Sequence, residues 1–232
     1  MIVLAVDTTT TVYTVAIIES NTLKAELFFN TRKKHSQRLM PMLDMLLDEV
    51  EIRVEDIDCY AVAKGPGSFT GIRIGMSALK ALAQVLNKPL VGVPSLDGLS
   101  QNVKHFNGLV CPVLNARKNE VYTAIYQGLD PKPLTEYLAA HPEKLVARLK
   151  KENQNVIMLG DGVCEYRDFF VESLEERVFF ASPENNLPRA SQIAFLGLDI
   201  YKNSSENHNF NYIEPIYIRK SEAENRLLST EG

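Results

Sequence analysis

The sequence lacks tryptophan, has four histidines and three cysteines, and contains no long apolar run. Its histidines and cysteines show no C-x-x-C pair and no spacing of metal ligands, so no metal site is predicted. No apolar run approaches the ~18 residues of a membrane span. The first residues, MIVLAVDTTT, have neither the basic segment nor the cleavage site of a signal peptide. A cytoplasmic protein with buried, reduced thiols and no membrane contact is therefore expected.

The chain also lacks an excess of basic residues: 25 Lys and Arg stand against 29 Asp and Glu, a net charge of −4. A protein of this charge has no general positive field with which to hold nucleic acid unaided. It has no ladder of aromatic and basic residues for single-stranded nucleic acid. A G-x-S-x-G elbow is missing, and the sequence assembles no Ser/His/Asp set. Unaided nucleic-acid binding and serine-hydrolase chemistry are therefore not predicted.

Short apolar runs predict a βββαβαβ order in the first part of the chain, which is an α/β arrangement of sheet and helix layers. The predicted strands and helices, in chain order, are Ile2–Val6, Val12–Ile18, Leu23–Thr31, His35–Val50, Cys59–Ala63, Ser68–Leu86 and Pro89–Val93. Residues 1–103 are assigned to this first lobe. Residues 104–232 are assigned to a smaller, less regular second lobe that ends in a short strand, Ile213–Ile218.

A glycine-rich turn leads into the longest predicted helix, with Ser68 or Thr70 as its N-cap. Gly67, Gly71 and Gly75 recur every four residues, and each costs about 1 kcal/mol in a helix interior. Such spacing indicates that something approaches this backbone closely. Three interpretations stay open: a phosphate cradle, a contact surface for a second helix, and a tight turn into a core helix. The standard P-loop and dinucleotide motifs both fail here, and the residues alone favour the tight turn.

Two further stretches leave alternatives open. The helix His35–Val50 is apolar nearly all round, with Met40 and Leu47 off its main apolar stripe, so it is either enclosed within the monomer or contacts a partner. The turn after the first strand holds Asp7, Thr8 and Thr9. These residues could bind a Mg²⁺-bound phosphate, or simply satisfy the amides of the turn, which the stretch alone favours.

Five segments together resemble the TsaB (YeaZ) family, from Val3 to about Arg219. They are VLAVDTTT, HSQRLMPMLD, DIDCYAVAKGPGSFTGIRIG, NARKNEVYTAIY and EPIYIR. The resemblance implies a two-lobed actin-like ATPase (ribonuclease-H-like) fold of mixed sheets flanked by helices. It also implies a role in making threonylcarbamoyl-adenosine beside the tRNA anticodon.

The role implied by the resemblance is that of a non-catalytic scaffold, which pairs with its catalytic paralogue TsaD and recruits the ATPase TsaE. A homodimer is expected when the chain is alone, and tRNA contact only through the complex. No cofactor is expected on this chain alone, and ATP or ADP only in the complex. The metal-binding H-x-x-x-H positions of TsaD fall on Ser95 and Leu99, so neither a metal nor peptidase activity is implied.

The resemblance further implies that the helices Ser36–Val50 and Ser68–Leu86 form the pairing face. The implied contact residues are Leu39, Met42, Leu43, Leu46, Gly67, Phe69, Gly71, Ile72, Gly75 and Leu79. A bulky residue at Gly71 or Gly75 is expected to abolish pairing and leave the monomer folded. The turn Asp7, Thr8 and Thr9 is then a remnant of a phosphate loop. The alternative is an ATP-dependent phosphotransferase or ATPase that uses Asp7.

Overall fold

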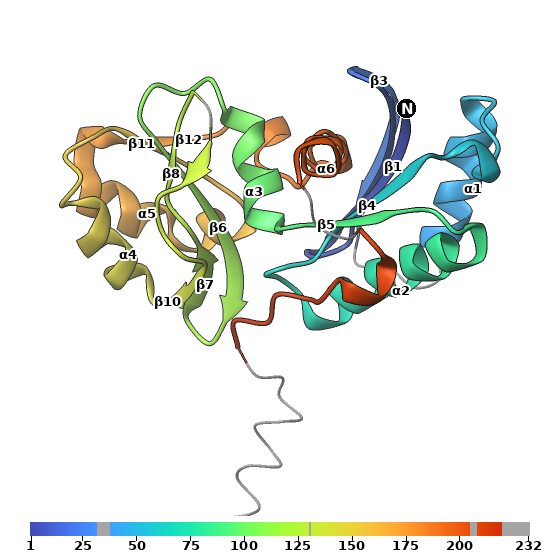
Figure 1. The fold of residues 1–232 in the computed structure, drawn as a ribbon. Coiled ribbons are helices and arrows are strands. Elements are labelled where there is room, and N and C mark those ends of the chain that lie inside the picture. The colour runs from blue at the N-terminus through green and yellow to red at the C-terminus, as the bar shows by residue number, and fades with distance from the viewer. Residues whose placement is uncertain (32–37, 130, 205–207, 220–232) are drawn as a thin grey trace, which may run out of the picture.

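The computed structural model describes residues 1–31, 38–129, 131–204 and 208–219, and it shows two lobes side by side, each built on one β-sheet (Figure 1). In the first sheet the strand order is β3-β2-β1-β4-β5. The strands β1, β2 and β3 form an antiparallel meander, and β4 and β5 run parallel to β1. Their bounds are Ile2–Asp7, Val12–Glu19, Thr22–Asn30, Cys59–Ala63 and Leu90–Val93, which confirms the predicted strands of this lobe.

Helices cover both faces of the first sheet. The helices α1 (Leu39–Glu49) and α2 (Phe69–Leu86) lie on one face, and α6 (Ala190–Asn203) lies on the other. As predicted, Ser68 is the N-cap of α2, since its hydroxyl accepts a hydrogen bond from the N–H of Gly71 at 3.3 Å. The helix predicted from residue 35 or 36 begins at Leu39 in the structure, with Arg38 at its N-cap position and no side-chain cap hydrogen bond; residues 32–37 lie outside the described part of the chain.

The second sheet repeats the plan of the first. Its main strands, in the order β10-β7-β6-β11-β12, have the same relative directions as β3-β2-β1-β4-β5. The strand bounds are Leu109–Arg117 (β6), Glu120–Thr123 (β7), Leu138–Ala140 (β10), Val156–Leu159 (β11) and Val178–Phe180 (β12). The short strands β8 (Tyr126–Gln127) and β9 (Lys132–Pro133) pair beside β6. The molecule is therefore a structural duplication without a sequence repeat.

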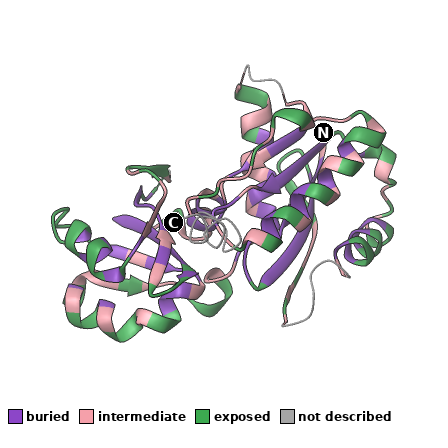
Figure 2. Cartoon of the chain, turned by 90° about the horizontal axis from the view of Figure 1, so that it is seen from below, coloured by how far each residue is buried: buried purple, intermediate pink, exposed green. Residues whose placement is uncertain are grey.

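Helices α4 (Pro142–Leu149) and α5 (Asp161–Leu174) cover one face of the second sheet, and α3 (Ser95–Ser100) covers the other. In Figure 2 the strands of both lobes are buried between helices whose outer sides are exposed. Single 3₁₀ turns connect these elements at Val54–Asp56, Gln101–Val103, Glu175–Arg177, Pro183–Asn185 and Phe210–Tyr212.

The division of the chain at residue 103 needs correction, because the chain returns to the first lobe after the second sheet. The helix α6 packs on the first sheet through Ile193, Ala194 and Leu198. Residues 208–219, here called the C-terminal strap, then run beside β5 and α2 toward the β6–β7 hairpin (Figure 1). The strand predicted at 213–218 is wrong: these residues have no regular secondary structure. Strand recognition failed there because, among the described residues, the segment is joined to the sheet edge only by isolated hydrogen bonds, such as Ile216 N–H to the Lys64 carbonyl, and not by a strand ladder.

Hydrogen bonds attach the strap at both ends. Near its start, the carbonyl of His208 accepts a hydrogen bond from Leu90 N–H at 3.0 Å. Further along, Ile216 N–H donates to the Lys64 carbonyl at 2.7 Å. At its end, Arg219 Nη1 donates to the carbonyl of Ala116 in the second lobe at 2.9 Å. The strap thus connects the two lobes in addition to the main-chain crossings.

A buried carboxylate fixes the start of α6 on the first sheet. The side chain of Glu26, on β3, is 4% exposed and pairs with Arg189 Nη2 at 2.6 Å. The N–H and hydroxyl of Ser191 also donate to Glu26, at 3.1 and 3.0 Å. Charge-assisted hydrogen bonds to a buried group are among the stronger polar contributions to stability.

Glu26→Ala is expected to lower the free energy of unfolding by about 2–3 kcal/mol, because it removes these bonds and leaves Arg189 without its partner. Urea denaturation of both proteins measures the difference. Glu19→Ala is the matched control: Glu19 is exposed and its pair with Lys24, at 3.2 Å, is worth only about 0.5 kcal/mol. Equal losses in the two variants would contradict a structural role for the Glu26 contacts.

Candidate functional site

The turn between β1 and β2 uses its polar groups within the chain. The carboxylate oxygen Oδ1 of Asp7 accepts hydrogen bonds from the N–H of Thr9 at 2.8 Å and from its hydroxyl at 2.7 Å. The hydroxyl of Thr8 donates to the carbonyl of Gly71 at 2.7 Å. Asp7, Thr8 and Thr9 are each 1% exposed. The structure therefore joins this turn to the start of α2 and shields it from solvent.

These contacts leave the turn poorly suited to hold a phosphate by itself. Burial raises the pKa of Asp7 above its ordinary value, and the hydrogen bonds from Thr9 offset part of that rise. A phosphate cradle needs free amides at the start of a helix. At the start of α2, Ser68 N–H already donates to the Thr9 carbonyl at 2.6 Å, and Gly71 N–H donates to the Ser68 hydroxyl. Two of the amides that a phosphate would need at this helix start, those of Ser68 and Gly71, are therefore already used within the chain.

The glycines of α2 permit a close approach, and the approaching group belongs to this chain. A Cβ added at Gly67 would overlap the Thr9 carbonyl, and one added at Gly71 would overlap the Thr8 carbonyl. A Cβ at Gly75 would lie 2.5 Å from the Thr8 hydroxyl oxygen. Of the three interpretations of this stretch, the tight turn into a core helix is therefore the one that the structure shows. A bulky residue at Gly71 or Gly75 would meet Thr8 of this chain, so we expect it to destabilise the monomer itself and not only its pairing.

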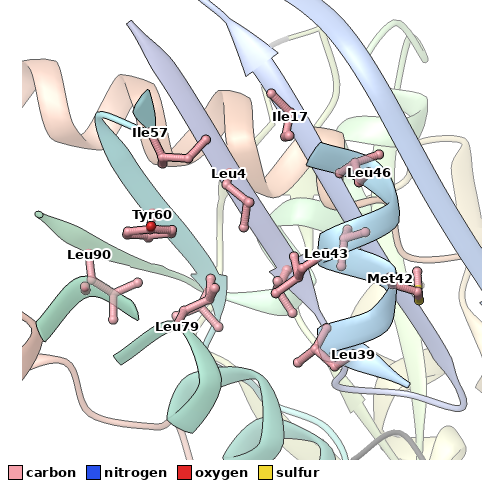
Figure 3. Close-up of a cluster of buried hydrophobic side chains, with 14 of the residues drawn as sticks. Leu4, Ile17, Leu39, Met42, Leu43, Leu46, Ile57, Tyr60, Leu79 and Leu90 are labelled. Atoms are coloured by element: carbon pink, nitrogen blue, oxygen red, sulfur yellow. The ribbon is translucent and has the colours of Figure 1, made fainter. Parts of the chain in front are cut away.

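Most of the expected contact residues are buried in the core of this chain. Figure 3 shows Leu39, Leu43 and Leu46 of α1 directed toward the first sheet, with Leu79 of α2 beside them. Eight of the expected contact residues are buried: six side chains are at most 4% exposed, and two glycines are also buried. They are Leu39, Met42, Leu43, Leu46, Ile72 and Leu79, with Gly71 and Gly75. Their assignment to a partner surface is corrected, because the apolar stripe of each helix packs on the sheet. Gly67 and Phe69 are partly exposed.

The exposed parts of the same two helices carry apolar groups among charged ones such as Asp44 and Asp48. Met40 and Met45 on α1 are 43% and 57% exposed, and Val85 on α2 is 81% exposed. Ala81, one turn before Val85, is also exposed. These four residues are here called the outer helix face. The sequence signal was the placement of Met40 off the main stripe of α1, but the helical wheel alone does not say which stripe meets the sheet.

Phe69 lies where α2 meets the C-terminal strap. Its ring stacks on Tyr217 with centroids 4.3 Å apart, and the guanidinium carbon of Arg73 lies 4.0 Å from the Phe69 centroid. Arg73 Nε also donates to the Tyr217 hydroxyl at 3.2 Å. Sequence reasoning placed Phe69 on the pairing face and did not foresee that the strap covers part of it.

Ser95 and Leu99, the two positions on which the resemblance places metal-binding histidines, have structural roles here. The Ser95 hydroxyl donates to the carbonyl of Pro66, and Leu99 is buried beside β6. Within residues 1–31, 38–129, 131–204 and 208–219, no group of three or more His, Cys, Asp or Glu side chains could hold a metal ion. Cys59 and Cys111 are buried, as expected, and burial raises the pKa of each thiol to about 12. Cys164 is exposed, contrary to expectation.

No helix in the described part of the chain combines the length and the apolar composition needed to cross a membrane. This finding agrees with the absence of long apolar runs in the sequence.

Two lobes with the same strand order, each with a helix leading from the parallel strand beside its hairpin, define the actin-like ATPase class of folds. Comparison with known proteins supports a narrower assignment. A family model described as "TsaD: tRNA N6-adenosine threonylcarbamoyltransferase" matches residues 29–227. The chain is similar to the tRNA threonylcarbamoyladenosine biosynthesis protein TsaB of Bacillus subtilis, at 33% identity, and to that of Escherichia coli, at 31%, with 100% of both chains covered in each case.

Among solved structures, the chain is similar to a Pseudomonas aeruginosa protein described as having similarity to the peptidase YeaZ. The TM-score is 0.79 at 25% identity, over 94% of this chain and 99% of that one. The chain belongs to the TsaB family, within the wider family that the TsaD model describes.

Gly71→Ala is expected to lower the free energy of unfolding by about 3 kcal/mol, although alanine is the better helix former, because the new methyl group overlaps the Thr8 carbonyl. Denaturation in urea measures the loss. Ser77→Ala, at an exposed position of the same helix, is the control and should be stabilised slightly or unchanged. A fully stable Gly71→Ala protein would show that the turn can move away from α2.

Asp7→Asn is expected to stabilise the protein at neutral pH and not in acid. The raised pKa means that ionising Asp7 weakens the fold as pH rises from about 4 through the folded-state pKa. Asparagine keeps an oxygen for the two Thr9 donors and has no charge to bury. The advantage of the variant should therefore be small near pH 4 and grow toward pH 8, in urea titrations at each pH. An advantage that shrinks as pH rises would indicate that a cation stabilises the ionised carboxylate.

Proposed function

We propose that this chain is a non-catalytic scaffold subunit required for threonylcarbamoylation of the adenosine beside the tRNA anticodon. It acts by pairing with the catalytic paralogue TsaD and by recruiting TsaE. The observation that carries the proposal is the similarity to proteins named TsaB over the full length of both chains. The match to the TsaD model is consistent with a paralogue of the transferase itself.

The outer helix face supports the pairing step. Met40, Met45 and Val85 are exposed although the same helices bury a complete apolar stripe against the sheet. Methionine side chains adapt to an apolar partner surface, and a well-packed apolar centre is typical of stable interfaces. Because α1 and α2 cover one face of the same sheet, a partner contributing two helices would form a four-helix contact. The same surface accepts a second copy of this chain when TsaD is absent.

The non-catalytic role is supported by the residues found at the expected metal-binding positions and in the phosphate-loop turn. Leu99 offers no ligand atom where the resemblance places a metal-binding histidine, and Ser95 donates its hydroxyl proton to the backbone. The Asp7 turn is buried and its hydrogen bonds are made within the chain. In this proposal the chain alone binds no cofactor, and ATP or ADP binds only in the assembled complex. The chain contacts tRNA only as part of that complex. The protein works in the cytoplasm and is not a peptidase.

The second candidate is an ATP-dependent phosphotransferase or ATPase that uses Asp7, because the fold is that of actin-like ATPases. Calorimetry of the purified chain with Mg-ATP separates the two. Micromolar affinity that is lost in Asp7→Ala would favour the enzyme, whereas no detectable heat favours the scaffold.

The decisive experiment is reconstitution of tRNA threonylcarbamoylation with TsaD and TsaE, with and without this chain. Product should form only in its presence. Equal product without it would refute the scaffold proposal.

A double variant, Met45→Glu with Val85→Glu, is expected to weaken pairing with TsaD at least tenfold, because it buries two carboxylates in an apolar contact. Sedimentation of the mixed proteins measures the affinity. Thermal unfolding of the variant alone, at a concentration low enough to keep both proteins monomeric, should be unchanged, since both side chains are exposed in the monomer.

Val171→Glu with Leu134→Glu is the matched control for that variant. Both positions are exposed apolar groups of the second lobe, so the same change in charge should leave pairing intact. Loss of pairing in the control and not in the test variant would place the interface on the second lobe.

A further inference from the structure

The turn of the β6–β7 hairpin places two basic residues in an unfavourable backbone conformation. Arg117, Lys118 and Asn119 have φ angles of 61°, 53° and 60°. A two-residue hairpin turn of the primed type requires positive φ at its two central residues, here Lys118 and Asn119. Asparagine tolerates this region well, whereas each long side chain costs about 1–2 kcal/mol there. Glycine or asparagine would form the same turn with less strain.

Within residues 1–31, 38–129, 131–204 and 208–219, no hydrogen bond or ion pair is found for the side chain of Arg117 or Lys118. Both residues are exposed, and among the described residues the recorded hydrogen bonds of Arg117 involve only its backbone: its N–H donates to Asn115 Oδ1 at 2.7 Å, and its carbonyl accepts from Arg219 at 3.4 Å. Strained positions occur disproportionately at functional sites, where the side chain is needed for something other than folding. The strain here is therefore a reason to look for a ligand of Arg117 and Lys118.

Acidic and basic groups both lie beside this turn, since Asp161 and Glu165 accept hydrogen bonds from Asn115, two residues before Arg117. Glu120, which faces Arg117 across the hairpin, pairs with Arg219 at 2.9 Å, so its charge is offset by the strap. Two residues before Arg219, the ring of Tyr217 is 38% exposed and stacks on Phe69, beside the exposed guanidinium of Arg73. Glu214 is the exposed acid on this part of the strap. Arg73, Arg117, Lys118 and Tyr217 are here called the hairpin surface.

We infer that the hairpin surface contacts the sugar–phosphate backbone of tRNA when this chain is in its complex, an inference that rests on the proposed function. Basic side chains from a protruding turn and from a helix suit a phosphate chain laid across them, because phosphate contacts need charge and little shape. The partly exposed ring of Tyr217 beside the guanidinium of Arg73 suits an unstacked base, because bases stack on aromatic and guanidinium planes. The chain as a whole has a net charge of −4, so the contact adds to RNA binding by the complex and does not replace it.

The occupant is RNA and not an isolated nucleotide, because the cations lie on separate elements of an exposed surface. Arg117 and Lys118 come from the tip of a hairpin, and Arg73 comes from the first turns of α2 in the other lobe. A single phosphate group is held by convergent donors at one point, whereas a polynucleotide meets separated charges along its length.

The test variant is Arg117→Asn with Lys118→Asn, in the reconstituted complex of this chain with TsaD. Asparagine removes both charges and tolerates positive φ, so the variant should fold at least as stably as wild type. Affinity for unmodified tRNA is measured by fluorescence anisotropy over a range of salt concentrations. The affinity should fall roughly tenfold at low salt, and the slope of log affinity against log salt should decrease by about 1.5, for two lost phosphate contacts.

Lys150→Gln with Lys151→Gln is the matched control. These two lysines are exposed just after the C-terminal end of α4, whereas it is the N-terminal end of α4, at His141, that contacts the hairpin residue Asn119. The variant therefore loses the same charge away from the hairpin, and its slope should equal that of wild type. An equal change in both variants would mean that only net charge matters and would overturn the inference. An unchanged affinity in the hairpin variant would overturn it too.

Two further outcomes separate this inference from the proposed function. If the hairpin variant no longer pairs with TsaD, the surface is a protein interface and the RNA assignment is wrong. If the wild-type chain is not required for tRNA modification, or the wild-type complex binds no tRNA, the proposed function fails together with the inference. If the wild-type chain is required and the variant binds tRNA as wild type does, the inference alone fails.

Discussion

The contact between the turn after β1 and the glycines at the start of α2 is the constraint on which the first lobe depends. Thr8 and Thr9 reach the helix backbone at Gly67 and Gly71, where any Cβ would overlap their carbonyls. Hydrogen bonds from Thr8 to Gly71 and from Ser68 to Thr9 then hold the two segments together. With α2 fixed at its first turn, its apolar stripe falls on the sheet and its other side faces outward.

The second lobe has an equivalent close contact between its hairpin and a helix start, formed by different residues. A Cβ at Gly160, which has a φ of 113°, would overlap the carbonyl of Val113 on β6. At this joint the carboxylate comes from the helix: Asp161, the first residue of α5, accepts the N–H of Asn115 at 2.9 Å. In the first lobe the carboxylate comes from the hairpin, as Asp7. Both lobes therefore have the same close contact between the hairpin and the helix start, but they form it with different residues. This explains why the duplication cannot be seen in the sequence.

Local patterns predicted most of the first lobe, because its strands and helices are each marked by an apolar period and a cap, as at Ser68. They could not predict which stripe of a helix meets the sheet. On the helical wheel of α1, Leu43 and Met45 are both apolar. Leu43 is buried and Met45 is exposed only because the sheet packs on the side of the helix that carries Leu43. The glycine spacing correctly indicated a close approach, but spacing does not distinguish a neighbour within the chain from a partner. The return of α6 and the path of the strap depend on contacts far apart in sequence, such as Glu26 with Arg189.

The placement of α6 has a consequence for the order in which the protein can acquire its structure during synthesis. The face of the first sheet that carries Val3, Ala5 and Ile18 is covered by residues 190–203, nearly two hundred positions downstream. The second sheet is contiguous, since its strands all lie between residues 109 and 180, so it can close while the first still has one bare apolar face. In a nascent chain of this protein that apolar face therefore stays uncovered, and open to aggregation, until α6 has left the ribosome.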